Sequence, residues 1–306
     1  MEDPEPGKSG NRHAVVEQNA SPRINHWKKK IPRTQRGETV EFLIVGEKIN
    51  SSRKSVKEAI EKGDTAFIQK LAQEQAAAGA QYIDANAGLL MEKEPEALAW
   101  LVKTIQAAVD RPCCLDSPNP IALEAGLRVH QARAMINSIS LEANRYDSIL
   151  ALVKRYQTRI IALCIDDQGM PQSADDRFRL ASTLIEKLKG EGIPREDIFV
   201  DPLVQPISTD SSFGTIALEA MEKIKKAFPD SHLICGLSNI SFGLPLRRLL
   251  NQVFFILALG RGLDAAIIDP NDPRMISGLK AARALLGQDP FCGGYLKAFR
   301  QNLLVV

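Results

Sequence analysis

Short apolar runs alternate with longer amphipathic stretches from about residue 41 onward. Such runs are typical of strands that are buried on both faces, and amphipathic periodicity is typical of helices. Eight apolar runs occur, at residues 42–45, 81–83, 113–115, 134–136, 160–165, 198–200, 232–235 and 265–268. Each is followed by a helical pattern, for example at residues 66–78, 94–109, 121–129, 175–191, 215–228, 246–259 and 273–286.

Eight strand–helix units predict an α/β protein with a single closed (β/α)8 TIM barrel. An open, doubly wound sheet usually has fewer strands and a glycine-rich first turn, and the sequence has no G-x-G-x-x-G motif. Residues 1–38 are polar and without periodicity, so we expect a flexible N-terminal extension there. We expect residues 39–306 to form the barrel domain.

Composition narrows the class of protein. The formal net charge of the 306 residues is only +2, which favours neither nucleic acid nor a membrane surface as a partner. The five cysteines form no C-x-x-C pair, and we expect reduced thiols, mostly buried as small apolar residues. The N-terminus lacks an apolar signal segment, and the longest apolar run, residues 253–259, is too short to cross a bilayer. These features predict a cytoplasmic protein.

Acid and amide side chains recur where the expected strands end. They include Glu47, Asn50, Asp84, Asn86, Asp116, Asn137, Asp166, Asp201, Asn239, Asp269 and Asn271. In a parallel barrel all strands end at one face, which is the face that carries active sites. Any one of these residues could instead cap the helix that follows. Recurrence at all eight ends favours a shared ligand site.

The chemistry of this rim limits its ligand. It is rich in Asp and Asn, which suit a neutral heterocycle because a carboxylate accepts two hydrogen bonds from a 2-aminopyrimidinone edge. A phosphate would favour a glycine-rich loop, Arg or Lys. Clustered carboxylates also suit Mg²⁺, so a metal is the competing ligand. The four histidines all miss the strand ends, so we expect no histidine-ligated metal, and we expect this chain to bind no metal.

Several motifs at these strand ends resemble the pterin-binding methyltransferase family. They are the stretches 46–50 (GEKIN), 84–88 (DANAG), 114–117 (CLDS), 135–138 (MINS), 201–204 (DPLV) and 236–245 (GLSNISFGLP). The family includes methyltetrahydrofolate:corrinoid protein methyltransferases, the glycine betaine–tetrahydrofolate methyltransferases and the folate domain of cobalamin-dependent methionine synthase. The resemblance extends from about residue 41 to residue 284, with the motifs in the same order.

The resemblance implies a role for each matching position. Asp116, Asn137 and Asp201 are expected to bind the pterin ring, and Asn239 is expected to reach N5 of the folate and support methyl transfer. Asp84 and Asn86 match a D-x-N element beside the same pocket. The remaining expected pterin-binding residues are Glu47, Gly236, Ser238 and Asp269.

The resemblance also implies a reaction and its partners. A methyl group would move between N5 of tetrahydrofolate and the cobalt of a corrinoid, and the chain would form a homodimer. The stretch 230–236 (DSHLICG) nearly matches the cobalt-ligating D-x-H-x-x-G signature, but its glycine comes one residue late and His232 lies in an expected strand. We therefore expect a separate corrinoid protein that docks transiently at the barrel rim.

Three other functions remain as alternatives. A dihydropteroate synthase would need an Arg-bearing S-x-R-P-G loop and a phosphate-binding Lys, and neither occurs at the matching strand ends. A pterin-binding subunit without catalytic activity would keep the same pocket, although an intact Asn239 and Asp201 favour an enzyme. The third alternative is an unrelated Mg²⁺-dependent lyase or aldolase on the same fold.

Overall fold

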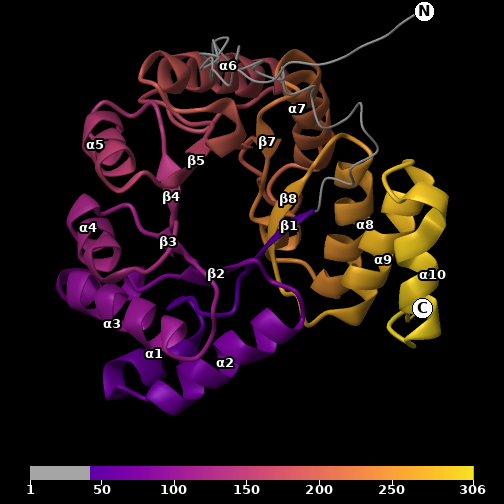
Figure 1. Ribbon diagram of the computed structural model, residues 1–306. Coiled ribbons are helices and arrows are strands. Elements are labelled where there is room, and N and C mark those ends of the chain that lie inside the picture. Colours follow the sequence, from indigo (N-terminus) through magenta and orange to yellow (C-terminus); the bar gives the residue numbers. More distant parts are fainter. Residues whose placement is uncertain (1–41, 306) are drawn as a thin grey trace, which may run out of the picture. The chain divides into compact units, whose positions relative to one another are not determined.

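The computed structural model describes residues 42–305, and its centre is a ring of eight parallel strands (Figure 1). The flexible extension expected at residues 1–38 lies outside the described residues and stays a prediction. The strands are β1 (Leu43–Gly46), β2 (Tyr82–Ala85), β3 (Cys113–Asp116), β4 (Met135–Ile139), β5 (Arg159–Leu163), β6 (Ile198–Asp201), β7 (His232–Leu233) and β8 (Ala265–Ile268). All eight expected strands are therefore present.

The ring closes between the last two strands. Strand β1 pairs with both β2 and β8, and the order around the sheet is β7-β6-β5-β4-β3-β2-β1-β8. Strand β7 is shorter than the expected run 232–235, but the next two residues still bond to the strands on either side. The N–H of Ile234 donates to the Val200 carbonyl of β6, and the N–H of Ile267 in β8 donates to the Cys235 carbonyl, each at 3.0 Å. The (β/α)8 barrel is confirmed.

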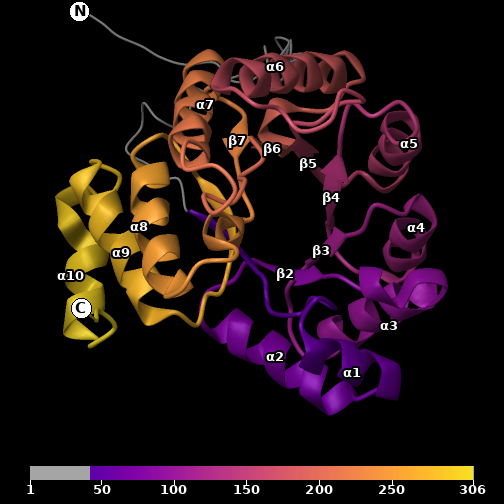
Figure 2. The ribbon, with the colours of Figure 1, turned by 180° about the vertical axis from the view of Figure 1, so that it is seen from behind.

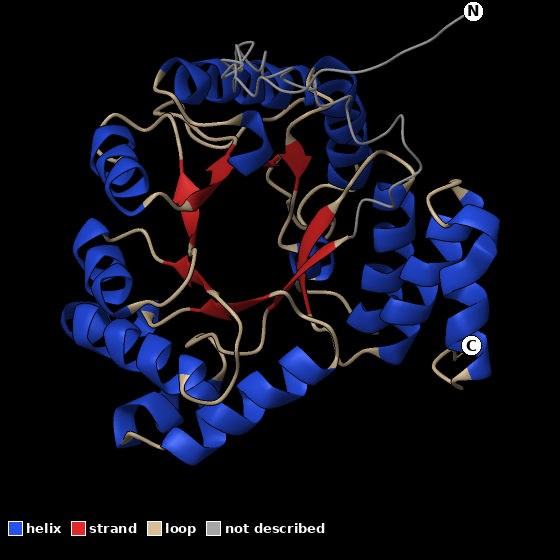
Figure 3. Cartoon of the chain, in the orientation of Figure 1, coloured by secondary structure: helices blue, strands red, loops and turns tan. Residues whose placement is uncertain are grey.

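Helices surround the ring, as the views from both sides and the coloured cartoon show (Figures 2 and 3). They are α1 (Lys54–Lys62), α2 (Thr65–Ala77), α3 (Glu94–Gln106), α4 (Pro120–Val129), α5 (Tyr146–Tyr156), α6 (Ala174–Gly190), α7 (Phe213–Ala227), α8 (Arg247–Leu259), α9 (Pro273–Leu285) and α10 (Gly293–Arg300). Short 3-10 helices are η2 (Gly88–Lys93), η3 (Arg195–Asp197), η4 (Leu237–Ser241) and η5 (Pro290–Cys292). Helix α5 follows β4 and completes the fourth strand–helix unit. Helices α1 and α10 are extra helices in the first and the last strand–helix units.

The apolar side chains of the strands form two separate cores. Each strand, or the residue that continues it, contributes one buried side chain to the barrel interior: Val45, Tyr82, Cys114, Met135, Ile161, Phe199, Ile234 and Ala265. The intervening residues, such as Ile44, Ile83 and Ile136, belong to the larger core between the strands and the helices. This division follows from the two-residue period of a strand, which sends successive side chains to opposite faces.

Candidate functional site

A polar layer lies directly above the apolar floor of the barrel interior. Two residues beyond Val45, Tyr82, Cys114, Met135 and Phe199, the strand period places Glu47, Asp84, Asp116, Asn137 and Asp201 on the same interior side. All five lie at the carboxyl ends of their strands, which is the catalytic face of such barrels. The structure thus brings together residues that are far apart in sequence.

Asp84, Asn86 and Asp116 form one connected group on β2 and β3. The Nδ2 of Asn86 donates to Oδ2 of Asp116 at 3.0 Å and to the Asp116 carbonyl at 3.1 Å. Asp84 is only 2% exposed, and its Oδ1 has no hydrogen-bond partner in the described part of the chain. Burial, with the charge of Asp116 added to it, raises the pKa of Asp84 well above its usual value, although a hydrogen bond from Asn50 opposes the rise.

Asp116 and Asp201 lie at the barrel mouth with most of their surface covered. Burial raises the pKa of each to about 6. For Asp116 the hydrogen bond from Asn86 opposes the rise, and for Asp201 the backbone N–H groups of Leu203 and Gly236 oppose it. Neither carboxylate forms an ion pair within residues 42–305, so both keep acceptor capacity for a ligand.

Asn137 lies beside Asp116 in the sheet. The two residues are register partners between β3 and β4, and the N–H of Ser117 donates to the Asn137 carbonyl at 3.1 Å. The Asn137–Ser138 peptide bond is cis. The amide of Asn137 adds a group of either hydrogen-bonding polarity to the two carboxylates.

Helix capping does not account for these acids. The observed N-caps are later loop residues, among them Asn119 before α4, Ser173 before α6 and Asp272 before α9. The carboxylate of Asp201 instead accepts from the N–H of Leu203 at 2.8 Å, within its own turn. The alternative of a simple helix cap is therefore wrong for Asp84, Asp116 and Asp201.

The opposite side of the mouth carries the turn η4 with Asn239. This side chain is exposed, and it makes no hydrogen bond within the described residues. Gly236 lies beneath it, since a Cβ on Gly236 would come within 3.2 Å of the Asn239 Nδ2. Asn239 is thus a free amide at the rim, facing solvent.

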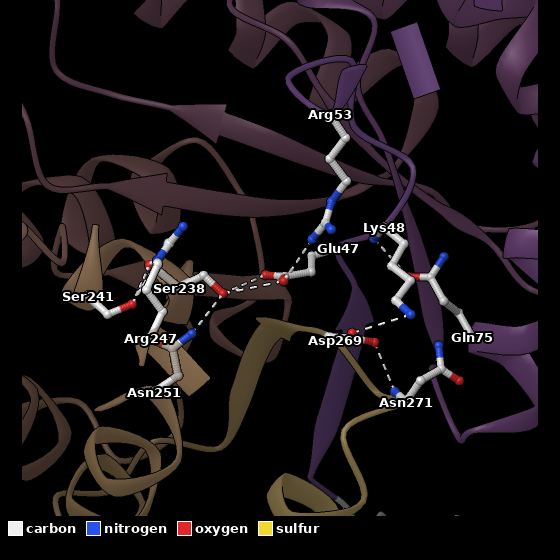
Figure 4. A network of polar contacts seen from close by, with 10 residues as sticks. All are labelled: Glu47, Lys48, Arg53, Gln75, Ser238, Ser241, Arg247, Asn251, Asp269 and Asn271. Atoms are coloured by element: carbon white, nitrogen blue, oxygen red, sulfur yellow. Dashed lines mark hydrogen bonds and ion pairs between the residues drawn. The ribbon is translucent and has the colours of Figure 1, made fainter. Parts of the chain in front are cut away.

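Glu47 and Ser238 join β1 to the same turn (Figure 4). The Ser238 hydroxyl lies 3.0 Å and 3.3 Å from the two carboxylate oxygens of Glu47, which also accepts from Arg53 Nη2 at 3.1 Å. Burial raises the pKa of Glu47, while the Ser238 hydrogen bond and the Arg53 charge oppose the rise. Glu47 therefore supports the turn that carries Asn239.

Asp269 lies beside Glu47 but is already paired. Its carboxylate is 3.3 Å from Lys48 Nζ and also accepts from the N–H of Asn271 at 3.0 Å (Figure 4). Sequence reasoning did not single out Lys48, although it belongs to the GEKIN motif. It also missed Arg145, whose charge opposes the rise in the pKa of Asp116, and Arg247, which donates a hydrogen bond to the Ser238 carbonyl in η4. The signal for Arg247 was its place at the start of a helix, eight residues after Asn239.

Two further features bear on the ligand. The Nδ1 of His232 donates to Asp264 Oδ2 at 3.2 Å, and the His232 ring stacks on Phe199 inside the barrel. Within residues 42–305, no group of three or more His, Cys, Asp or Glu side chains could hold a metal ion. Four of the five cysteines are buried, as expected, and all five are free thiols. Over the same residues, every helix is too short or too polar to span a bilayer.

Comparison with known proteins matches this chain to a family. Residues 46–269 match the family described as pterin binding enzyme. The chain is 40% identical, over 264 residues, to the methylcorrinoid:tetrahydrofolate methyltransferase of Eubacterium limosum, covering 85% of this chain and 97% of that protein. It is 30% identical over 239 residues to methionine synthase of Mycobacterium tuberculosis; this covers 74% of the chain but only 20% of that longer enzyme.

Solved structures agree on the fold. Dihydropteroate synthase from Xanthomonas albilineans, in complex with 7,8-dihydropteroate, superposes with a TM-score of 0.62 at 15% identity, covering 80% of this chain and 94% of that one. Dihydropteroate synthase from Yersinia pestis gives a TM-score of 0.59 at 15% identity, covering 81% and 93%. At such low identity, these likenesses concern the barrel alone.

Proposed function

The chain belongs to the pterin binding enzyme family, and from this premise we propose that it is a methyltransferase acting between tetrahydrofolate and a corrinoid. The methyl group moves between N5 of the folate and the cobalt of a corrinoid carried by a separate protein. The name of the Eubacterium limosum relative gives the direction from methylcorrinoid to tetrahydrofolate, and we propose the same direction here.

One observation carries this proposal: two covered carboxylates that form no ion pair in the described chain lie at the barrel mouth, and a free amide lies at the same mouth. Asp116 and Asp201, with Asn137, would accept and donate hydrogen bonds along the 2-aminopyrimidinone edge of a pterin. Asp84 and Asn86 lie behind them, and Asn86 orients the Asp116 carboxylate. Gly236 leaves room for Asn239 above the ring.

Asn239 would act at the reacting nitrogen. When N5 attacks the methyl carbon, the carbon–cobalt bond breaks, its electron pair stays on cobalt as Co(I), and N5 becomes positively charged until its proton leaves to solvent. A neutral amide cannot take up this proton as a strong base, but its oxygen can accept a hydrogen bond from the cationic N5–H. The same contact would serve the reverse reaction, in which N5 must be protonated before it can leave.

The cobalt would come from the partner. His232 is the one histidine in a near-match to the cobalt-ligating signature, and its Nδ1 is engaged by Asp264 within the barrel. This arrangement supports a corrinoid carried by another protein, which would present its cofactor at the open mouth. The contact would then be transient, since folate must enter and leave through the same face.

We further propose that the enzyme is a cytoplasmic homodimer. Helix α8 exposes Leu249, Val253, Ile256 and Leu257, which share one face of the helix. A twofold axis across this face would bury it on both copies. Sedimentation should give a dimer for the wild type and a monomer for Val253→Glu; a wild-type monomer would contradict the proposal. The five free thiols are consistent with a reducing compartment.

The enzymatic proposal is tested with purified components. The chain, tetrahydrofolate and methylcobalamin should yield methyltetrahydrofolate and Co(I), followed by the absorbance of the corrinoid. The same reaction in the presence of a chelator should proceed unchanged, which separates it from a Mg²⁺-dependent enzyme. If the chain binds a pterin but transfers no methyl group to or from any corrinoid, the methyltransferase proposal is wrong. A pterin-binding subunit without catalytic activity would then be the better description. Condensation of a pterin pyrophosphate with 4-aminobenzoate would indicate a dihydropteroate synthase instead.

A further inference from the structure

Helix α6 carries an arginine that is fully buried. Arg177 is 0% exposed, and its guanidinium forms no ion pair with an acid within residues 42–305. Burial lowers the pKa of Arg177, yet a guanidinium stays charged at neutral pH. A buried charge is costly unless its donors are used, so the contacts of Arg177 show which part of the fold it serves.

The Arg177 guanidinium joins two loops at the carboxyl ends of the strands. Its Nη1 donates to the Ser173 carbonyl at 3.1 Å, in the loop between β5 and α6. Its Nη2 donates to Gln205 Oε1, and both Nη2 and Nε lie 3.5 Å from the Leu203 carbonyl, in the loop between β6 and α7. Because a guanidinium is planar and its donors keep a fixed spacing, these bonds hold residues 203–205 in one place relative to α6.

Leu203 is held from two sides. Its N–H donates to Asp201 Oδ1 at 2.8 Å, and its carbonyl faces Arg177. Leu203 has a φ of 64°, a conformation that an L side chain rarely adopts and that persists only where the surrounding structure holds it. The N–H that orients the Asp201 carboxylate is thus kept in place by the arginine on the other side of the same residue.

The charge of Arg177 also acts on Asp201. It opposes the rise that burial causes in the pKa of Asp201. The other titratable groups that face Asp201 are the thiols of Cys164, directly after β5, and Cys235, just beyond β7. Burial, with the charge of Asp201 added to it, raises the pKa of both thiols well above the usual range, so both are uncharged at neutral pH. Arg177 is therefore the cation of the described residues that favours the charged form of Asp201.

We propose that Arg177 is a positioning residue for pterin binding, which holds residues 203–205 so that this turn aims the Asp201 carboxylate at the ligand. Its charge favours the ionised carboxylate that accepts the hydrogen bonds of the pterin. The inference rests on the proposed pterin site, and it does not depend on methyl transfer. Arg177 itself does not reach the ligand, because its side chain is fully buried and its donors bond within the fold.

The test measures tetrahydrofolate affinity by isothermal titration between pH 5 and pH 8. Arg177→Met removes both the bonds and the charge, whereas Arg177→Lys keeps the charge but lacks the fixed fork of donors. Arg179→Met is the control, since Arg179 is an exposed arginine two residues along the same helix. At pH 8, Arg177→Lys should weaken binding about twofold to tenfold, the range of one hydrogen bond, and Arg179→Met should bind like the wild type.

The pH profile separates this role from general support of the fold. Without the charge of Arg177 the pKa of Asp201 should rise further, so that less of the carboxylate is ionised at low pH. For each unit of that rise, the ratio of wild-type to Arg177→Met affinity should increase about tenfold from pH 8 to pH 5. In Arg177→Lys the charge remains, and the ratio should be the same at every pH. A constant ratio in Arg177→Met would overturn the proposal, because general support of the fold does not depend on the charge of Asp201.

Hydrogen exchange adds a measurement that needs no ligand. The peptide that contains residues 203–205 should exchange faster in both Arg177 variants than in the wild type, and at the wild-type rate in Arg179→Met. If Arg177→Met does not fold, Arg177→Lys decides, and wild-type affinity and exchange in that variant would overturn the proposal. If the wild type binds tetrahydrofolate but transfers no methyl group, the proposed methyltransferase fails, while these affinities still decide the role of Arg177.

Discussion

The two ends of the barrel each bury a carboxylate, and the two differ in their partners. At the amino-terminal end, Asp264 accepts from Lys225 Nζ at 2.8 Å and lies 3.2 Å from His232 Nδ1. Burial alone would raise its pKa, but the His232 hydrogen bond and the Lys225 charge outweigh burial and hold the pKa below its usual range. At the carboxyl-terminal end, Asp201 accepts hydrogen bonds only from backbone N–H groups, and burial raises its pKa to about 6 although the charge of Arg177 opposes the rise.

This difference separates an acid that is paired within the fold from one that keeps unused acceptor capacity. A buried carboxylate with cation partners stabilises the fold in its charged form, and its neighbours explain it fully. A buried carboxylate without them costs stability when it ionises, and it keeps acceptor capacity that the protein itself does not use. Four predictions test this distinction, starting with the largest expected effect.

Asn239→Ala should have the largest effect, and it should act on catalysis alone. Loss of one hydrogen bond at the reacting atom lowers turnover by about a hundredfold to a thousandfold. Tetrahydrofolate affinity and the melting temperature should change little, because the side chain is exposed and without a partner in the described residues. Single-turnover transfer, fluorescence titration and thermal unfolding measure the three quantities. Equal losses of rate and affinity would count against a role at N5.

An Asp→Asn substitution should change the free energy of unfolding in opposite directions at the two ends of the barrel. Asp264→Asn leaves Lys225 without its buried partner and should lower the free energy of unfolding by about 2–3 kcal/mol. Asp201→Asn removes a charge that is costly to bury and should raise it by about 1 kcal/mol at pH 8. Urea denaturation measures both. A loss of stability in Asp201→Asn would show that its charge is compensated within the fold.

Pterin affinity should depend on one end only. Asp201→Asn replaces a charged acceptor by a neutral amide and should weaken tetrahydrofolate binding by about tenfold to a hundredfold, the range of a charge-assisted hydrogen bond. Asp264→Asn is the matched control at the other end, and under conditions in which it is folded it should bind tetrahydrofolate with the affinity of the wild type. Isothermal titration compares the two variants with the wild type. Equal affinities in all three would remove Asp201 from the site.

The pH dependence gives the smallest effect. A native pKa of about 6 against an unfolded value near 3.8 means that the native state holds more protons between these values, so the contribution of Asp201 to stability falls as pH rises through this window. Affinity should follow the opposite course and fall about tenfold from pH 7 to pH 5 for each carboxylate whose charge it needs. In Asp201→Asn, the pH profile of affinity should be less steep than in the wild type, because one of the titrating carboxylates is gone. A flat wild-type profile would contradict the charged form as the binding species.

The fold was predictable because its signals are local. Each strand is visible in the sequence as a short apolar run. The two-residue period of a strand then predicts that the polar residue two positions beyond an interior side chain lies on the same side. Helix α5 also has a local signal, because its buried residues at 146, 149, 150 and 153 have helical spacing. The sequence analysis predicted the strand before it but did not name this helix. The seventh strand was predicted at residues 232–235, and the structure shortens it to His232–Leu233, although Ile234 and Cys235 still bond to the neighbouring strands.

The site was predictable only in part. The strand-end positions of Asp116, Asn137 and Asp201 followed from pattern and resemblance, and their binding roles stay predictions. The contacts that set their chemistry join distant segments: Ser238 and Glu47 are 191 residues apart, and Asn86 and Asp116 are 30 apart. No local pattern encodes such pairs. The hydrogen bonds of Arg247 could not be predicted for the same reason, because they depend on how α8 packs against η4.

The sequence by itself determined the barrel, the residues at the carboxyl ends of its strands and the family, because each depends on periodicity or on contiguous motifs. The tertiary structure alone decided which carboxylates are paired. Asp264 forms ion pairs with Lys225 and His232 at one end, whereas Asp201 at the other forms no ion pair in the described residues and accepts only from backbone N–H groups. The physical reason is that the charged state of a buried group depends on desolvation and on neighbours within a few ångströms. Only the closed ring of strands brings those neighbours together.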